Sequence, residues 1–151
     1  MELKQQLQTI IDEAPLYGIA PAIMANAIAS GLESVARQLA HLEYYVLQNL
    51  SEDWIISVIS NNKQREKKVI YAFSTLQDAK NFNTSQETDV VAISLPVVQI
   101  LFRLFSVQQI DSIIFFERAG NPKGVELKRR DLQALLQQQI QQLKTTPPDL
   151  A

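Results

Sequence analysis

Residues 54–73 read WIISVISNNKQREKKVIYAF, and this stretch decides the fold. It holds two short runs, residues 54–60 and 68–73, that are rich in β-branched and aromatic side chains, as β-strands are. The polar residues 61–67 between them predict the loop of a β-hairpin. Because the apolar spacing changes at Trp54, the chain is expected to change there from helix to strand.

Downstream of this hairpin, helix and strand patterns alternate. Helices are predicted for residues 74–82, 96–105 and 132–143, and strands for residues 90–94, 113–116 and 125–127. Ser74 or Thr75 is expected to accept the first free backbone N–H groups of the first of these helices. From residue 51 onward the expected order is therefore ββαβαββα, an α+β domain with helices packed on a mixed sheet.

Upstream of the hairpin, the first fifty residues predict helix. A short first helix with an apolar seam is expected to end at Pro15, because proline breaks a helix interior. A second helix is expected to begin near Pro21 and to continue to Leu50, since no proline intervenes. Its apolar residues repeat in a heptad-like seam: Ile28, Leu32, Val35, Leu39, Leu42 and Val46.

The length of this second helix sets the expected domain organisation. About 28 residues of helix would be about 42 Å long, which exceeds the expected width of the remaining domain. The helix must therefore cover a broad sheet face or project as an arm and pair with another chain. We expect a helical segment at residues 1–50, an α+β domain at 51–144 and a flexible tail at 145–151. The heptad-like seam is then the expected interface of a homodimer.

Composition narrows the class of protein. The chain has 151 residues and is 46% hydrophobic, which is enough for one core. With 14 basic and 16 acidic residues, no strong field favours nucleic acid or anionic lipid as a partner. No apolar run approaches the roughly 20 residues of a membrane span. The absence of cysteine excludes thiol chemistry, and the polar start of the chain predicts a cytoplasmic protein.

Residues with catalytic or metal-binding chemistry are sparse. His41, the only histidine, has no serine or cysteine nucleophile pattern to serve and is interpreted as a helix-edge residue. Glu52 and Asp53 are adjacent, so in extended backbone they point to opposite sides and make a poor metal site. We therefore assign no catalytic, cofactor-binding or metal-binding residue and expect the chain not to be an enzyme.

Two basic stretches are candidates for contact with phosphate groups. Residues 63–68 could act together with residues 128–130, although Glu66 interrupts them and no aromatic side chain is present to stack a base. The stretch GNPKG, residues 120–124, lacks the spacing of a phosphate loop and precedes a strand, so it predicts a turn between strands. The candidate anion contacts are Lys63, Arg65, Lys67 and Lys123.

The region of residues 70–144 also carries a family resemblance. A strand ending in Phe73-Ser74 precedes a short helix, and a later strand runs through Asn121-Pro122 towards a leucine-rich last helix. This order resembles the N-terminal-type domain of the SseB family, the enhanced serine sensitivity proteins. Residues 74–82 followed by 91–95 are also similar to the family of the chloroplast translocon's small intermembrane-space subunit and its bacterial relatives. The resemblance implies an α+β interaction module and carries over no catalytic residue.

Two functions from different classes are therefore expected. The first is a non-enzymatic cytoplasmic protein-interaction module that self-associates through its N-terminal helices. The alternative is a sensor domain that binds a small anion or metabolite with its basic turns. Light scattering tests the first and ligand titration tests the second.

Overall fold

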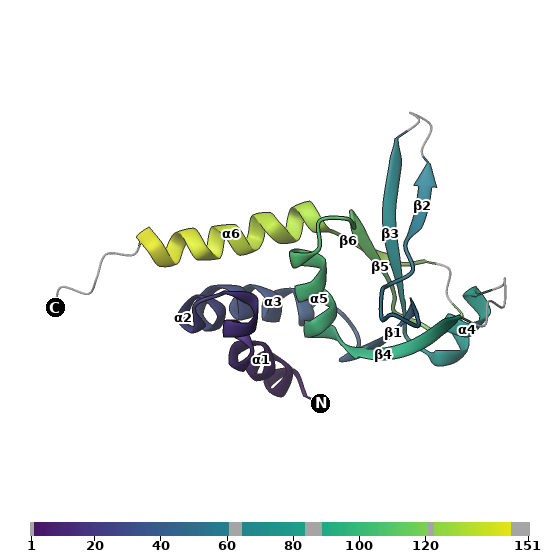
Figure 1. Cartoon of the computed structure of the whole chain (residues 1–151), viewed down its shortest axis with the longest axis horizontal. Helices are drawn as coiled ribbons and strands as arrows, with labels where there is room; N and C mark the ends of the chain where they lie inside the picture. The colour runs from purple at the N-terminus through teal and green to yellow at the C-terminus, as the bar shows by residue number, and fades with distance from the viewer. Residues whose placement is uncertain (1, 61–64, 84–88, 121–122, 146–151) are drawn as a thin grey trace.

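One mixed β-sheet organises the molecule, as the computed structural model of the chain shows (Figure 1). The structure describes residues 2–60, 65–83, 89–120 and 123–145. Within these residues the sheet has six strands in the order β4-β1-β3-β5-β6, with β2 added to β3. The strands are β1 (Glu43–Asn49), β2 (Ser57–Ser60), β3 (Glu66–Phe73), β4 (Val90–Pro96), β5 (Ser112–Phe116) and β6 (Val125–Lys128). The predicted α+β class is confirmed.

The central strand β3 connects all parts of the sheet. It pairs in parallel with β5, whereas the other strand pairs are antiparallel. Its first half pairs with β2 and its last residues pair with β1, so β1 and β2 share one edge of β3. The β2–β3 hairpin consequently extends beyond the rest of the sheet (Figure 1).

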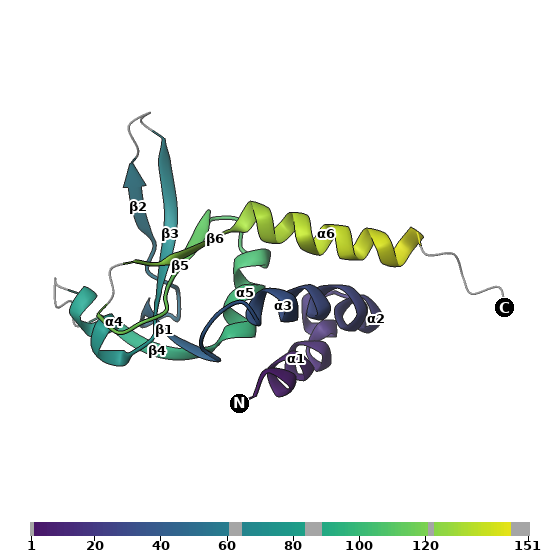
Figure 2. The same cartoon turned by 180° about the vertical axis from the view of Figure 1, so that it is seen from behind.

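Helices cover the two faces of the sheet unequally. α4 (Leu76–Phe82) packs on one face, where Phe73 and Leu47 enter a small core. The opposite face holds the main core and the larger helical layer, in which α6 lies along α2 and α3 (Figure 2). The elements of this layer are α1 (Leu3–Asp12), η1 (Ala14–Tyr17), α2 (Pro21–Ile23), η2 (Met24–Ile28), α3 (Ala29–Ala36), α5 (Val97–Ser106) and α6 (Arg129–Thr145). None of the helices in the described part of the chain is long and apolar enough to cross a bilayer.

The expected helix from Pro21 to Leu50 is wrong in its second half. Helical structure ends at Ala36, and residues 43–49 form strand β1 between β3 and β4. Tyr44 and Val46 enter the main core, while Leu47 enters the small core on the other face. A strand that is buried on both faces carries a continuous apolar run, and such a run also matches helical spacing. The heptad-like pattern therefore continued across the boundary between helix and strand.

The heptad-like seam consequently does not lie on one helix. Ile28 and Leu32 are buried in the helical layer and Val46 is buried in β1, all within the core of this chain. Val35 and Leu39 pack partly buried against the same core, whereas Leu42 is 45% exposed in the connection to β1. Residues 43–49 of the segment 1–50, which was expected to be helical, belong to the sheet as strand β1.

The start of α4 forms as its sequence predicts. Thr75 has extended backbone geometry, and its hydroxyl accepts the N–H of Asp78 at 3.1 Å. Of the two capping residues that the sequence allows, the structure selects Thr75. Asp78 in the first turn also accepts the N–H of Gly120 at 2.9 Å, which fastens the turn after β5 to this helix.

The segment GNPKG joins two strands that are antiparallel neighbours, β5 and β6. Gly120 has φ of +70°, a left-handed conformation that glycine adopts without steric cost. At Gly124 a Cβ atom would lie 2.4 Å from Cγ2 of Ile114, so a side chain there would collide with β5. Asn121, Pro122 and the expected tail after residue 145 lie outside the described residues, as does Lys63.

Candidate anion-binding site

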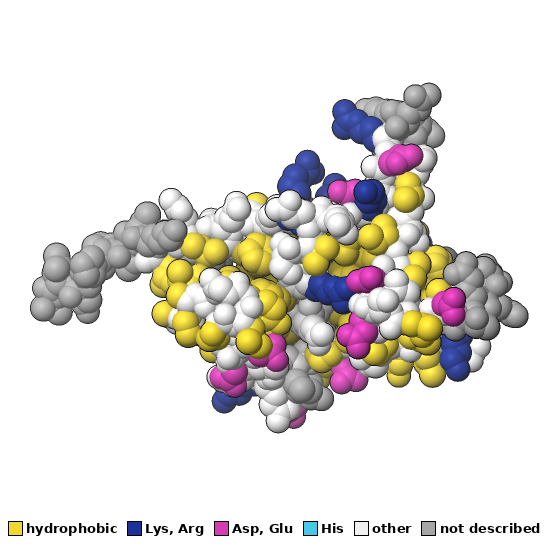
Figure 3. Space-filling model, viewed as in Figure 1, with side chains coloured by type: hydrophobic (Ala, Val, Ile, Leu, Met, Phe, Trp, Pro, Cys, Tyr) yellow, Lys and Arg dark blue, Asp and Glu magenta, His cyan; other side chains and the backbone are white. Residues whose placement is uncertain are grey.

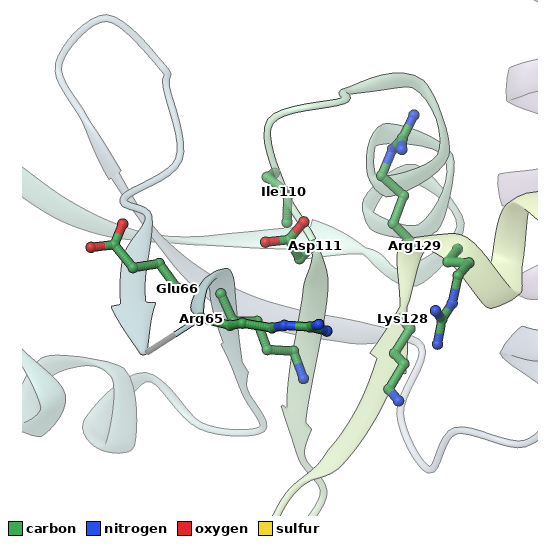
Figure 4. Close-up of a pocket in the computed structure, with 8 residues that line it drawn as sticks. Arg65, Glu66, Ile110, Asp111, Lys128 and Arg129 are labelled. Atoms are coloured by element: carbon green, nitrogen blue, oxygen red, sulfur yellow. The ribbon is translucent and has the colours of Figure 1, made fainter. Parts of the chain in front are cut away.

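A cavity of about 400 Å³ opens where β6 passes into α6. Three segments surround it: the start of β3, the residues before β5, and the junction of β6 with α6. Its lining residues are Arg65, Glu66, Lys67, Ile110, Asp111, Lys128, Arg129 and Arg130 (Figure 4). In the space-filling view, basic side chains gather on the upper edge between α6 and the β2–β3 hairpin (Figure 3).

Asp111 holds the three segments together. Its backbone N–H donates to the carbonyl of Lys68, and its carboxylate accepts the N–H of Lys68, both at 2.8 Å. Its carbonyl accepts the N–H of Arg129, the first residue of α6, also at 2.8 Å. These hydrogen bonds fix the position of Arg65 and Lys67 relative to the basic residues of the β6–α6 junction.

Replacing Asp111 with alanine is expected to lower the free energy of unfolding by about 1 kcal/mol, because the exposed N–H of Lys68 loses its carboxylate acceptor but remains accessible to water. Asparagine keeps an acceptor oxygen, so Asp111→Asn is expected to cost less than Asp111→Ala. Urea denaturation of both variants measures the difference. Equal losses in the two variants would show that this hydrogen bond does not contribute.

The cavity is rich in positive charge. Five of its lining residues are basic and two are acidic. Lys67 forms an ion pair with Glu126 on β6, and the hydrogen bond from Lys67 holds the pKa of the Glu126 carboxyl below its usual value although partial burial acts in the opposite direction. Lys67 is thus partly neutralised within the chain.

Three of the basic residues that line the cavity are exposed to solvent: Arg65, Lys128 and Arg130. Figure 4 shows the Arg65 guanidinium extending from the β3 side across the end of β5, whereas Lys128 and Arg129 point in opposite directions from the β6–α6 junction. Lys128 interacts electrostatically with Glu126, whereas Arg130 forms no ion pair within the described residues. Cations therefore approach the cavity from two sides.

The start of α6 adds backbone donors to the same place. Lys128 directly precedes the helix, and an ammonium group has donors only, so it cannot accept the first free N–H groups. Asp111 accepts the N–H of Arg129, whereas no acceptor is recorded in the described structure for the first-turn N–H of Arg130. The Nε atom of Arg129 is buried and likewise lacks a hydrogen-bond partner among the described residues. A helix N-terminus with free N–H groups and nearby cations favours an anion.

The structure brings together only part of the predicted anion contacts. Arg65 and Lys67 line the cavity with residues 128–130, as the sequence allowed. Lys123 lies before the opposite end of β6 and does not line it. Asp111 was not predicted from the sequence as a residue of this site. Its signal in the sequence is its position directly before the strand at residues 112–116.

His41 belongs to a second polar cluster, which lies around Glu117. The Glu117 carboxylate accepts the N–H of Ala40 at 2.6 Å and the hydroxyl of Tyr44, and its backbone carbonyl accepts from His41 Nε2 at 2.6 Å. Tyr44 is fully buried, and this burial, together with its hydrogen bond to Glu117, raises the pKa of its hydroxyl. These contacts fasten the connection before β1 to the end of β5.

Glu52 and Asp53 lie in the tight turn that follows β1. Asn49 accepts the N–H of Asp53 at 3.0 Å, and the carbonyl of Glu52 accepts from Arg103, which stacks on the ring of Trp54. Among the described residues, no three acidic or histidine side chains are grouped closely enough to hold a metal ion.

In comparisons with known proteins, no family model and no curated protein sequence matches this chain.

Proposed function

We propose that this chain is a binding module for an anionic ligand, which occupies the cavity at the start of α6. The observation that carries this proposal is that Arg65, Lys128 and Arg130 line one cavity beside the N-terminus of a helix of 17 residues. Cations and free helix N–H groups both favour negative charge, and here they act on the same space.

The proposal extends the second of the two functions that the sequence allowed. It assigns no bond-making step to the chain. A cytoplasmic location is part of the same proposal, and the lack of cysteine fits a reducing compartment. The resemblance to the SseB family remains a prediction.

Anion titration tests the proposal. In low-salt buffer, isothermal titration calorimetry with sulfate and with inorganic phosphate is expected to show binding. The double variant Lys128→Gln/Arg130→Gln is expected to lower the affinity at least about tenfold, because each exposed cation contributes a charge-assisted hydrogen bond that solvent only partly screens.

A matched control separates this site from general charge effects. Lys4 and Lys80 are exposed and lie outside the cavity, so Lys4→Gln/Lys80→Gln removes the same net charge from other surfaces. Its affinity is expected to stay close to that of the unchanged protein. An equal loss in both double variants would contradict a localised site.

Self-association is a separate prediction. Because Ile28, Leu32 and Val46 are buried in the core of their own chain, a dimer would have to use a surface other than the heptad-like seam. Light scattering at micromolar concentration tests whether the chain forms the expected homodimer.

A further inference from the structure

We infer that the ligand of this cavity is a small phosphorylated molecule with a polar, non-aromatic body, such as a sugar phosphate. This inference rests on the proposed function and specifies the chemical class of the anion. It follows from the types of donor that line the cavity, from their positions around it, and from the lack of aromatic side chains among the described lining residues.

The donors suit a tetrahedral dianion. Arg65 reaches the cavity from the start of β3, while Arg130 and Lys128 belong to the β6–α6 junction on the other side. Guanidinium groups bind phosphate oxygens through paired N–H donors, and the start of α6 can supply backbone N–H donors beside them. A phosphate group has three oxygens that such donors can contact at once, whereas a carboxylate has two in one plane.

The other lining residues indicate the chemistry of the non-phosphate part of the ligand. Among the described residues that line the cavity, Ile110 is the only apolar one and none is aromatic. A nucleobase would therefore find no ring to stack on, although stacking is a main source of affinity for bases. Glu66 is also part of the lining, and a carboxylate is an acceptor that suits ligand hydroxyl groups.

The size and charge of the cavity limit the ligand further. A volume of about 400 Å³ is within the range of about 300–1,000 Å³ that is typical of small-molecule sites. Glu66 and Asp111 also line the cavity. Their carboxylates would repel the parts of an extended polyanion that reach beyond the basic residues. One phosphate group on a compact polar molecule satisfies both limits.

Calorimetric titrations at pH 8 and low salt compare four probes: glucose 6-phosphate, inorganic phosphate, AMP and malonate. At this pH phosphate monoesters are dianions, so malonate matches their charge with planar carboxylates. Glucose 6-phosphate is expected to bind about tenfold more tightly than malonate, because charge-assisted donors can engage more of its oxygens. AMP is expected to bind no more tightly than glucose 6-phosphate.

The outcomes separate this inference from the proposed function. If malonate binds as tightly as glucose 6-phosphate, or AMP binds tenfold more tightly, the inferred ligand class is wrong while anion binding stands. If none of the four probes binds, both are wrong. Loss of glucose 6-phosphate binding in Lys128→Gln/Arg130→Gln, but not in Lys4→Gln/Lys80→Gln, places the phosphate in this cavity. Circular dichroism confirms that both double variants are folded.

Discussion

Replacing Gln6 with leucine is expected to lower the free energy of unfolding by about 1–3 kcal/mol, because the buried N–H of Val98 loses its hydrogen-bond acceptor, whereas the carbonyl of Leu42 still accepts the N–H of Val97. The Gln6 side chain is only 2% exposed. Its Oε1 accepts the N–H of Val98 at 3.0 Å, and its Nε2 donates to the carbonyl of Leu42 at 3.0 Å. Leucine has a similar size but offers neither group. Urea denaturation monitored by circular dichroism measures the loss.

The position of Gln6 explains why this effect should be large. α5 begins after Pro96, which has no side-chain acceptor for the first N–H groups of the helix. Gln6 supplies that acceptor from α1, so it joins α1 to α5 and to the connection before β1. Gln8 is exposed on the same helix, and Gln8→Leu is expected to change stability by less than about 0.5 kcal/mol. Equal effects of the two substitutions would contradict the capping role of Gln6.

Replacing Gly31 with valine is expected to cost about 3 kcal/mol, because α3 and α6 pack too closely for a side chain at this position. A Cβ atom on Gly31 would lie 2.4 Å from Cδ2 of Leu136. Leu136 is fully buried in the main core, so moving its side chain away would disturb the packing around it. The extra methyl groups of valine would force the two helices apart. Thermal unfolding measures the effect.

Ser30 provides the control for this substitution. It precedes Gly31 in α3 and is exposed, so Ser30→Val changes helix propensity by a few tenths of a kcal/mol without meeting α6. A further test combines Gly31→Ala with Leu136→Ala, in which the smaller side chain on α6 makes room for the new one. The combined loss is expected to be smaller than the sum of the single losses. Additive losses would show that the two positions do not interact.

Local sequence patterns predicted much of the fold because many elements depend on nearby residues. The hairpin around residues 61–67, the Thr75 cap and the apolar face of α5 follow from spacing and side-chain type. The nature of β1 does not, since its two faces are buried by residues that are distant in the sequence, both before and after this strand. Only the pairing of β1 with β3 and β4 shows that Tyr44 to Asn49 is a strand.

The candidate site was predictable only in its parts. Arg65 and Lys67 are visible as a basic stretch, and so are residues 128–130. What brings them together is the parallel pairing of β3 with β5 and the position of Asp111 between β3 and α6. Both contacts join residues that are far apart in the sequence, so local sequence patterns do not predict them. The cavity is therefore a property of the tertiary structure.

The most direct test of the central claim is a nitrogen-15 NMR titration with inorganic phosphate, which suits a chain of 17.1 kDa. If an anion occupies the start of α6, the amide signals of Arg130, Asp131 and Asp111 should shift together and reach saturation. The signals of Lys4 and Lys123, which lie away from the cavity, should remain in place. Absence of saturable shifts at the start of α6, or saturation at another surface only, would contradict the assignment of this cavity as an anion-binding site.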